Sequence, residues 1–344
     1  MKKINILYLV FFLHVSLPSE GNNKQTKELA NENFELIVKK IQYLNYKERI
    51  YTIKSLDKLS QNDKKRFFPI LADISIQDRD PMIQEVSLNF LSENLADCEI
   101  CKEAYKKNLY HPEEKVKLAA LKGIENLKIK ELEKEFLELL KQADFTQNSI
   151  FLGALIRTLG ILEYNQKEIS NFLKEKYNDE TTNKEIKRIL LLYAGNSKNI
   201  DFLEIIETAL DNREDMYLQG YAINAIGKLQ NQISLEQQKQ LKEKLKKMYN
   251  EISNHPDPKE RAKFNLLKQQ ILLTLIRLKD EALKEEIKTM ALDDDANIRK
   301  KALEYIEELE LKEFKDLLEI KYKYDSSKSV KKEAERILKK WNYL

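Results

Sequence analysis

The sequence is poor in the residues that interrupt regular secondary structure. Its 344 residues include only 7 Gly and 6 Pro, which is few for a chain of this length. This scarcity disfavours glycine-rich phosphate loops and folds built on many tight turns. We also find no block of alternating Val, Ile and Thr of the kind that predicts β-strands. Leu, Lys, Glu and Ile are abundant instead, and together they predict an all-α fold.

Residues that build catalytic and metal centres are scarce as well. The chain has three His, two Cys and one Trp. His111 and His255 each precede a proline in a predicted turn, and neither an HExxH motif nor a Ser/His/Asp grouping is present. Acidic pairs occur throughout, so they mark no site. We therefore expect a protein that is not an enzyme and that holds no metal and no cofactor.

One short motif, CEIC, leaves three alternatives for Cys98 and Cys101. A CxxC motif begins a helix in thiol oxidoreductases, where the helix N-terminus lowers the pKa of one thiol. That chemistry needs a βαβ context, which this sequence lacks. In an exported protein, two close cysteines more often form a structural disulfide, and a pair of buried thiols is the third alternative.

Neither sign of charge dominates. The chain has 60 basic and 57 acidic residues, for a formal net charge of +3. This near balance gives no overall attraction to nucleic acid. The two signs are interspersed along the chain, which is typical of solvated helix faces.

Long apolar runs are missing except near the N-terminus. Two lysines precede the run INILYLVFFLHV (residues 4–15), and a polar segment follows. About a dozen apolar residues is short for a membrane span but suits a secretory signal peptide. Ser19 and Gly21 would stand at positions −3 and −1 of a cleavage after Gly21. We predict that residues 1–21 are a signal peptide, or an uncleaved anchor that allows membrane contact, and that the body is periplasmic or otherwise exported.

An internal repeat organises the rest of the chain. One aliphatic or aromatic anchor per repeat recurs every 31 to 36 residues, with a single step of 49. The anchors are Tyr51, Ile83, Val116, Ile150, Ile186, Leu218, Leu267, Ile298 and Val330. Small or aliphatic residues stand four positions after the anchors, and aliphatic residues recur five and eight positions after them. This spacing predicts a helix with an apolar stripe along one side.

The beginnings of these helices are marked by polar residues three positions before the anchors. These candidate N-caps are Asp80, Asn183, Asp215, Asp295 and Ser327. A second amphipathic segment lies upstream of each, for example residues 132–142 and residues 201–210. Each repeat is therefore predicted to consist of a helix A, a short turn and a helix B. The 49-residue step is explained by a long helix A.

Over about residues 30 to 344 the chain resembles the HEAT-repeat family, including its shorter bacterial members. The segment DANIRKKAL (residues 295–303) carries the motif: a polar turn, an aliphatic residue, a basic residue and then Ala–Leu. The family's arginine corresponds to Arg299, and lysines take this place at Lys117, Lys187 and Lys331.

This resemblance implies a right-handed superhelical solenoid of about nine helix-turn-helix repeats, with the B helices on the concave side. Residues 22–344 would form a single solenoid whose C-terminal helix, with Trp341, caps the last repeat.

The concave surface would be lined by the side of each helix B that lies opposite its apolar stripe. The first two repeats place polar residues there, including Lys54, Asp57, Glu85 and Asn89. The central repeats place apolar residues there: Leu152, Gly153, Ile156, Ile189, Leu192, Tyr221 and Leu273. The last two place basic residues there: Lys300, Lys301, Lys332, Arg336 and Lys340.

Two interpretations of this gradient are open. Leu152, Ile156, Ile189, Leu192, Tyr221 and Leu273 could line a groove that binds an extended or helical protein segment with an acidic flank. Alternatively, the central helices are buried on both sides by tight curvature or by self-association. The basic end is either a contact for an anionic partner or a solvated face.

HEAT-like arrays usually serve as binding surfaces, so the resemblance implies an exported, non-catalytic scaffold or adaptor. It would bind one or more proteins through its concave face, within a periplasmic or cell-envelope assembly. The alternative is a binder of an anionic polymer, lipid headgroup or nucleic acid through the basic C-terminal repeats, although export disfavours nucleic acid. No small-molecule substrate is predicted.

Overall fold

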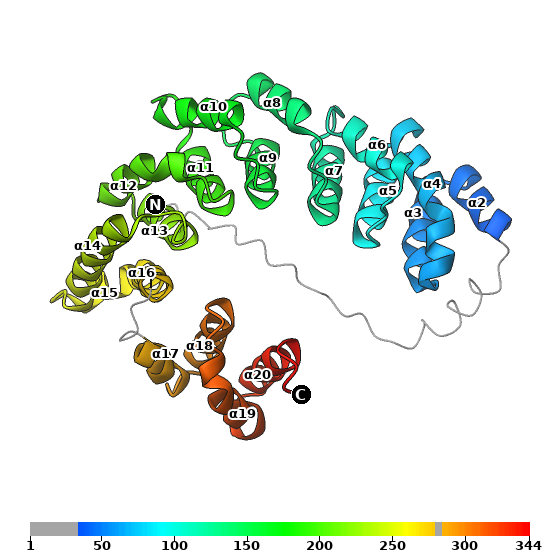
Figure 1. The fold of residues 1–344 in the computed structure, drawn as a ribbon. Helices are drawn as coiled ribbons and strands as arrows, with labels where there is room; N and C mark the ends of the chain where they lie inside the picture. Colours follow the sequence, from blue (N-terminus) through cyan, green and yellow to red (C-terminus); the bar gives the residue numbers. More distant parts are fainter. Residues whose placement is uncertain (1–33, 279–283) are drawn as a thin grey trace, which may run out of the picture. The chain divides into compact units, whose positions relative to one another are not determined.

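The computed structural model describes residues 34–278 and 284–344, apart from the side chains of Glu260 and Ala262. In these two ranges the chain is helical, with no strand (Figure 1). The predicted all-α fold class is therefore confirmed. The predicted signal segment, residues 1–21, lies outside the described residues.

The helices divide into two compact units, one ending at Lys128 and the other beginning at Ile129. The first unit contains α2 (Phe34–Tyr43), α3 (Tyr46–Ser55), η1 (Leu56–Lys58), α4 (Gln61–Gln77), α5 (Pro81–Glu93), α6 (Glu99–Asn108) and α7 (Glu114–Leu127). In this unit α5 packs between α3 and α7, and α4 and α6 pack against each other and behind α5 and α7. The result is two layers of helices, as a repeat of helix A and helix B predicts.

The second unit repeats this arrangement over a longer stretch. It contains α8 (Glu133–Gln142), α9 (Ile150–Ile161), α10 (Lys167–Asn178), α11 (Lys184–Asn196), η2 (Ile200–Phe202), α12 (Leu203–Asp211), α13 (Met216–Lys228), α14 (Leu235–Ser253), α15 (Pro258–Lys263), α16 (Asn265–Arg277), α17 (Lys284–Ala291), α18 (Ala296–Glu308), η4 (Lys312–Phe314), α19 (Lys315–Tyr324) and α20 (Lys328–Lys340). Here α9, α11, α13 and α16 pack in sequence, and α18 packs on α20. The long helix predicted for the 49-residue step is α14, which has 19 residues.

Side-chain caps fix where most of the predicted helices begin. The carboxylates of Asp80, Asp215 and Asp295 accept hydrogen bonds from backbone N–H groups in the first turns of α5, α13 and α18. The side chain of Asn183 does the same for α11. These contacts satisfy N–H groups that have no partner inside the helix. Ser327 precedes α20 but makes no such bond.

Three arginine–aspartate pairs connect one pair of helices to the next. Arg49 pairs with Asp78, Arg188 pairs with Asp215 at 2.8 Å, and Arg299 pairs with Asp325 at 2.8 Å. The Arg299–Asp325 pair is the most buried of the three. Arg299 also donates to the carbonyl oxygens of Asp293 and Asp294. Each pair therefore ties a helix to the turn of the following repeat.

Candidate protein-binding groove

In the first unit α3, α5 and α7 lie side by side in one row (Figure 1), with α5 packed between the other two. Residues two, three and six positions after the anchors Tyr51, Ile83 and Val116 all lie on this side. Ile53 and Ala119 are buried, whereas the other seven of these positions are half-buried or exposed and can line a hollow between the helices.

This hollow has a volume of about 600 Å³, and we call it the α3–α5–α7 groove. Its apolar lining comes from Ile53, Val86, Phe90, Leu118 and Ala119, of which Val86 and Leu118 are half-buried and the other three are buried. Its polar lining comes from Lys54, Asp57, Glu85, Asn89, Glu93, Lys115 and Lys122. An apolar lining with a few polar groups is the usual composition of a binding site.

Some of the polar groups of the groove are already paired. The ammonium of Lys122 lies 2.8 Å from Glu93, and Lys64 reaches Asp57 at 3.6 Å. By contrast, Lys54, Glu85, Lys115 and Asn89 make no side-chain contact with another polar group among the residues that the structure describes. The α3–α5–α7 groove thus offers unpaired groups of both signs and one free amide.

A second hollow of about 730 Å³ shares Glu85 and Lys115 with the α3–α5–α7 groove. Tyr46 and Met82 supply exposed apolar surface there, and the Tyr46 hydroxyl donates to the Met82 sulfur at 2.7 Å. Its remaining polar lining is acidic: Asp80, Glu113 and Glu114. The hollowed surface therefore continues from the groove toward the N-terminal ends of α5 and α7, where it becomes more acidic.

The apolar residues predicted to bind protein are mostly not on an open surface. Leu152, Ile156 and Leu273 are buried, with 1%, 0% and 8% of their surface exposed. Ile189, Leu192 and Tyr221 are half-buried. The burial of Leu273 supports the alternative interpretation for α16, that this helix is covered on both sides, whereas the burial of Leu152 and Ile156 has another cause.

Leu152 and Ile156 are buried, contrary to the prediction, because the predicted anchor of this repeat is one residue too early. Ile150, the predicted anchor, is 64% exposed, whereas Leu155 and Leu159 are buried four and eight positions after Phe151. Phe151 is therefore the anchor of α9. Each residue turns a helix by about 100°, so this shift moves Leu152 and Ile156 from the predicted concave side to the stripe side.

Glycine brings the helices of this region close together. A methyl group added at Gly195 in α11 would lie 2.8 Å from the Cα atom of Ala225 in α13. One added at Gly153 in α9 would lie 2.9 Å from the end of the Ile189 side chain. Ile189, another residue of the predicted groove, thus packs over Gly153 and occupies the space that a larger side chain there would need.

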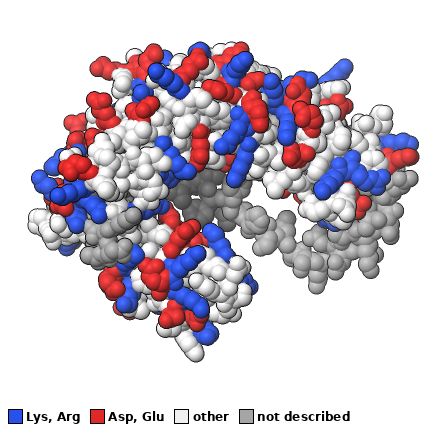
Figure 2. Space-filling model, in the orientation of Figure 1, with Lys and Arg blue, Asp and Glu red and all other residues white. Residues whose placement is uncertain are grey.

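The basic residues of the last two repeats are interleaved with acids. Lys300 and Lys301 both pair with Glu304, and Arg336 and Lys340 both pair with Glu307. Lys332 alone of the five predicted contacts has no partner among the described side chains. Both signs also mix over the visible face in Figure 2. Hydrogen bonds from Arg336 and Lys340 lower the pKa of Glu307 to about 2, so this carboxylate stays charged at neutral pH.

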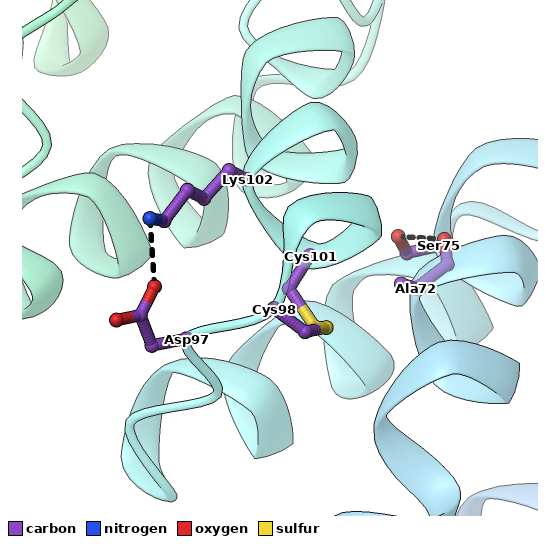
Figure 3. The surroundings of a disulfide bond; sticks show 6 residues. All are labelled: Ala72, Ser75, Asp97, Cys98, Cys101 and Lys102. Carbon is purple, nitrogen blue, oxygen red and sulfur yellow. Dashed lines mark hydrogen bonds and ion pairs between the residues drawn. A yellow bond between two sulfur atoms is a disulfide. The ribbon is translucent and has the colours of Figure 1, made fainter.

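Cys98 and Cys101 are joined by a disulfide (Figure 3). Cys98 is half-buried at the start of α6 and Cys101 is fully buried. The neighbouring Lys102 pairs with Asp97 at 2.8 Å. Of the three alternatives that the sequence left open, the structure has the disulfide. Nor do residues 34–278 and 284–344 bring together three His, Cys, Asp or Glu side chains that could hold a metal ion.

No family model matches the chain, and no curated protein matches it. The HEAT-repeat resemblance therefore stays a prediction. None of the described helices combines the length and the apolar character needed to cross a bilayer.

Proposed function

We propose that this protein is an exported, non-catalytic scaffold that binds a segment of a partner protein in the α3–α5–α7 groove. In this proposal the helices belong to a right-handed solenoid of about nine HEAT-like repeats, and the groove is the binding part of its concave side. The observation that carries the proposal is the combination of an apolar lining with unpaired Lys54, Glu85, Asn89 and Lys115 across three successive helices.

The chemistry of the groove favours an extended polypeptide of mixed charge. The Asn89 amide has both a donor and an acceptor, the same pair of groups that a peptide unit presents. Glu85 can receive a basic side chain, and Lys54 and Lys115 can receive acidic ones. Packed helices lie about 8–10 Å apart, so three of them span about 20 Å, which about six extended residues would cover.

The proposed setting is the periplasm or another part of the cell envelope. It rests on the residue pattern of segment 1–21, with two lysines, a short apolar run and small residues at a cleavage position. The protein would hold components of an envelope assembly together, or anchor one of them.

The alternative proposal, binding of an anionic ligand by the basic C-terminal repeats, draws less support. Glu304 and Glu307 pair with four of the five cations on which it depends, and their two negative charges offset half of those four positive charges. Exposed pairs of this kind are individually weak, but they reduce the net positive field that an anionic polymer would meet.

A displayed library of random 12-residue peptides tests the proposed function. Selection on the full chain should enrich peptides that carry both charge signs and apolar side chains. Their binding should weaken about tenfold in the charge-reversal variant Glu85→Lys/Lys115→Glu.

The matched control is Lys65→Glu, because Lys65 is exposed on α4 and does not line the groove. If the enriched peptides bind both variants and the unchanged protein equally, the groove is not their site and the proposal fails.

A further inference from the structure

A third hollow lies in the second unit, at the 49-residue step of the repeat. It has a volume of about 410 Å³ and lies where α14 and α16 meet the end of α12 and the beginning of α13. Its apolar lining comes from Leu210, Met248, Ile252, Phe264 and Leu267. A hollow of this size matches the pockets that hold small molecules. It is separate from the α3–α5–α7 groove, and the inference below does not rest on the proposed function.

A buried side-chain amide lines this pocket. Gln219 is 6% exposed, and its Nε2 donates to the Leu210 carbonyl oxygen at 3.0 Å. Its Oε1 accepts no hydrogen bond from the part of the chain that the structure describes. Gln219 Oε1 is not among the side-chain atoms that are buried without a partner, so a group that enters the pocket can reach it. The pocket therefore offers an acceptor for an N–H or O–H group.

The lining of the pocket contains one more basic side chain than acidic side chains. Lys244 pairs with Asp211 at 2.6 Å, and Arg213 pairs with Glu251 at 3.8 Å. Lys247 has no partner within the described residues. The lining thus has one uncompensated positive charge.

His255 adds a donor to the same lining. Its Nδ1 accepts from the Asp257 backbone N–H at 3.3 Å. In the neutral imidazole this bond places the proton on Nε2, which can donate to an oxygen atom of a ligand.

We propose that this pocket binds a small amphipathic monoanion: an apolar body, an N–H donor and a carboxylate, as in an N-acylated apolar amino acid. The apolar body packs against Met248, Ile252 and Phe264. The N–H group donates to Gln219 Oε1, and the carboxylate faces Lys247. A free acylated amino acid and the C-terminal residue of a polypeptide share this chemistry.

Titration calorimetry with the full chain tests this site. The probe is N-acetyl-L-phenylalanine, which has all three features. One comparison probe is N-acetyl-L-phenylalaninamide, which lacks the charge, and the other is 3-phenylpropionate, which lacks the N–H. We expect saturable one-to-one binding of the first probe and about threefold to fivefold weaker binding of each of the others.

Two variants locate the site. Lys247→Met should weaken binding of N-acetyl-L-phenylalanine about threefold and leave binding of its amide unchanged, whereas Lys239→Met, an exposed change elsewhere on α14, should alter neither. Met248→Trp should fill the pocket and abolish binding of all three probes.

A longer probe distinguishes a free acylated amino acid from the C-terminal residue of a polypeptide. Tighter binding of acetyl-Ala-Ala-Phe than of N-acetyl-L-phenylalanine would identify a polypeptide C-terminus, and weaker binding a free small molecule. The inference is overturned if the unchanged protein shows no saturable binding at up to about 10 mM, or if Lys247→Met leaves the preference for the carboxylate intact.

Discussion

Two rows of helices pack in the same way but differ in how closely they pack. They are α3–α5–α7 in the first unit and α9–α11–α13 in the second. The first row keeps a hollow of about 600 Å³ lined by unpaired polar groups. In the second row Gly153 and Gly195 allow neighbouring helices to approach closely. The same repeat can therefore serve binding where its inner positions are polar and stability where they are small or aliphatic.

The largest expected effect comes from placing a glutamate at a stripe position of α9 and at a groove position of α5. Leu152→Glu should lower the free energy of unfolding by about 4 kcal/mol or more, because it buries a carboxylate without a partner. Asn89→Glu, at a half-buried position of the α3–α5–α7 groove, should change it by less than about 0.5 kcal/mol. Urea unfolding followed by circular dichroism measures both. Equal effects would show that Asn89 is as enclosed as Leu152 and that the groove is not open.

A second test removes a buried charge from the packed part of the second unit. Asp325→Asn leaves Arg299 without its carboxylate and should cost about 3 kcal/mol, measured by the shift of the urea midpoint.

This pair also predicts a pH dependence. Burial alone would raise the pKa of Asp325, but hydrogen bonds from Arg299, the Ser327 N–H and Lys321 lower it to about 2. Because the folded pKa lies below the unfolded value of about 3.9, this stabilisation is present above about pH 4 and is lost as the pH falls toward 2. The Asn variant should lose less stability over this range than the unchanged protein. If both lose the same amount, the pair does not contribute as described.

Adding one methyl group at each of two glycines tests why the second row is closed. Gly195→Ala meets the backbone of Ala225 and should cost about 2 kcal/mol. Gly153→Ala meets only the flexible end of Ile189 and should cost less than about 1 kcal/mol. Thermal unfolding of the two variants gives the comparison, and the reverse order would mean that backbone approach at α11–α13 does not limit the packing.

The smallest expected change in stability comes from removing one of the paired cations near the C-terminus. Lys301→Ala removes an exposed pair with Glu304 at 2.8 Å and should change stability by less than about 0.5 kcal/mol. Binding of heparin, as a model anionic polymer, should be weak and nearly the same in the variant. Tight heparin binding that Lys301→Ala reduces severalfold would favour the anionic-ligand alternative.

The sequence was sufficient to predict where the helices lie, but not which of their residues are exposed. Spacing and caps predicted the helices, because a buried stripe and an unpaired N–H both leave local traces, as at Asp80 and Asp295. The exposed side of α9 was missed because Ile150 and Phe151 are both apolar and adjacent, and hydrophobicity alone does not choose between them. Equal steps of 35 residues from Val116 to Phe151 and from Phe151 to Ile186 were the available signal.

The groove itself could not be predicted from the sequence. Lys54, Asp57, Glu85 and Asn89 were placed on the concave side, but a polar residue there resembles any solvated residue. Whether three helices leave a hollow depends on how closely they pack, which only the structure gives. The sequence also left the bonding of Cys98 and Cys101 undecided. A disulfide depends on the distance between the two side chains and on their direction, which the structure supplies.

The most direct test of the central claim is site-specific photo-crosslinking in the cells that make this protein. A photoreactive amino acid is placed at Asn89 in the α3–α5–α7 groove, and separately at Lys65 on α4 as a control. We predict a discrete adduct with one or a few proteins from Asn89, lost in the Glu85→Lys/Lys115→Glu variant and missing from Lys65. An Asn89 position that yields no adduct, or the same adducts as Lys65, would contradict the claim that this groove binds a partner.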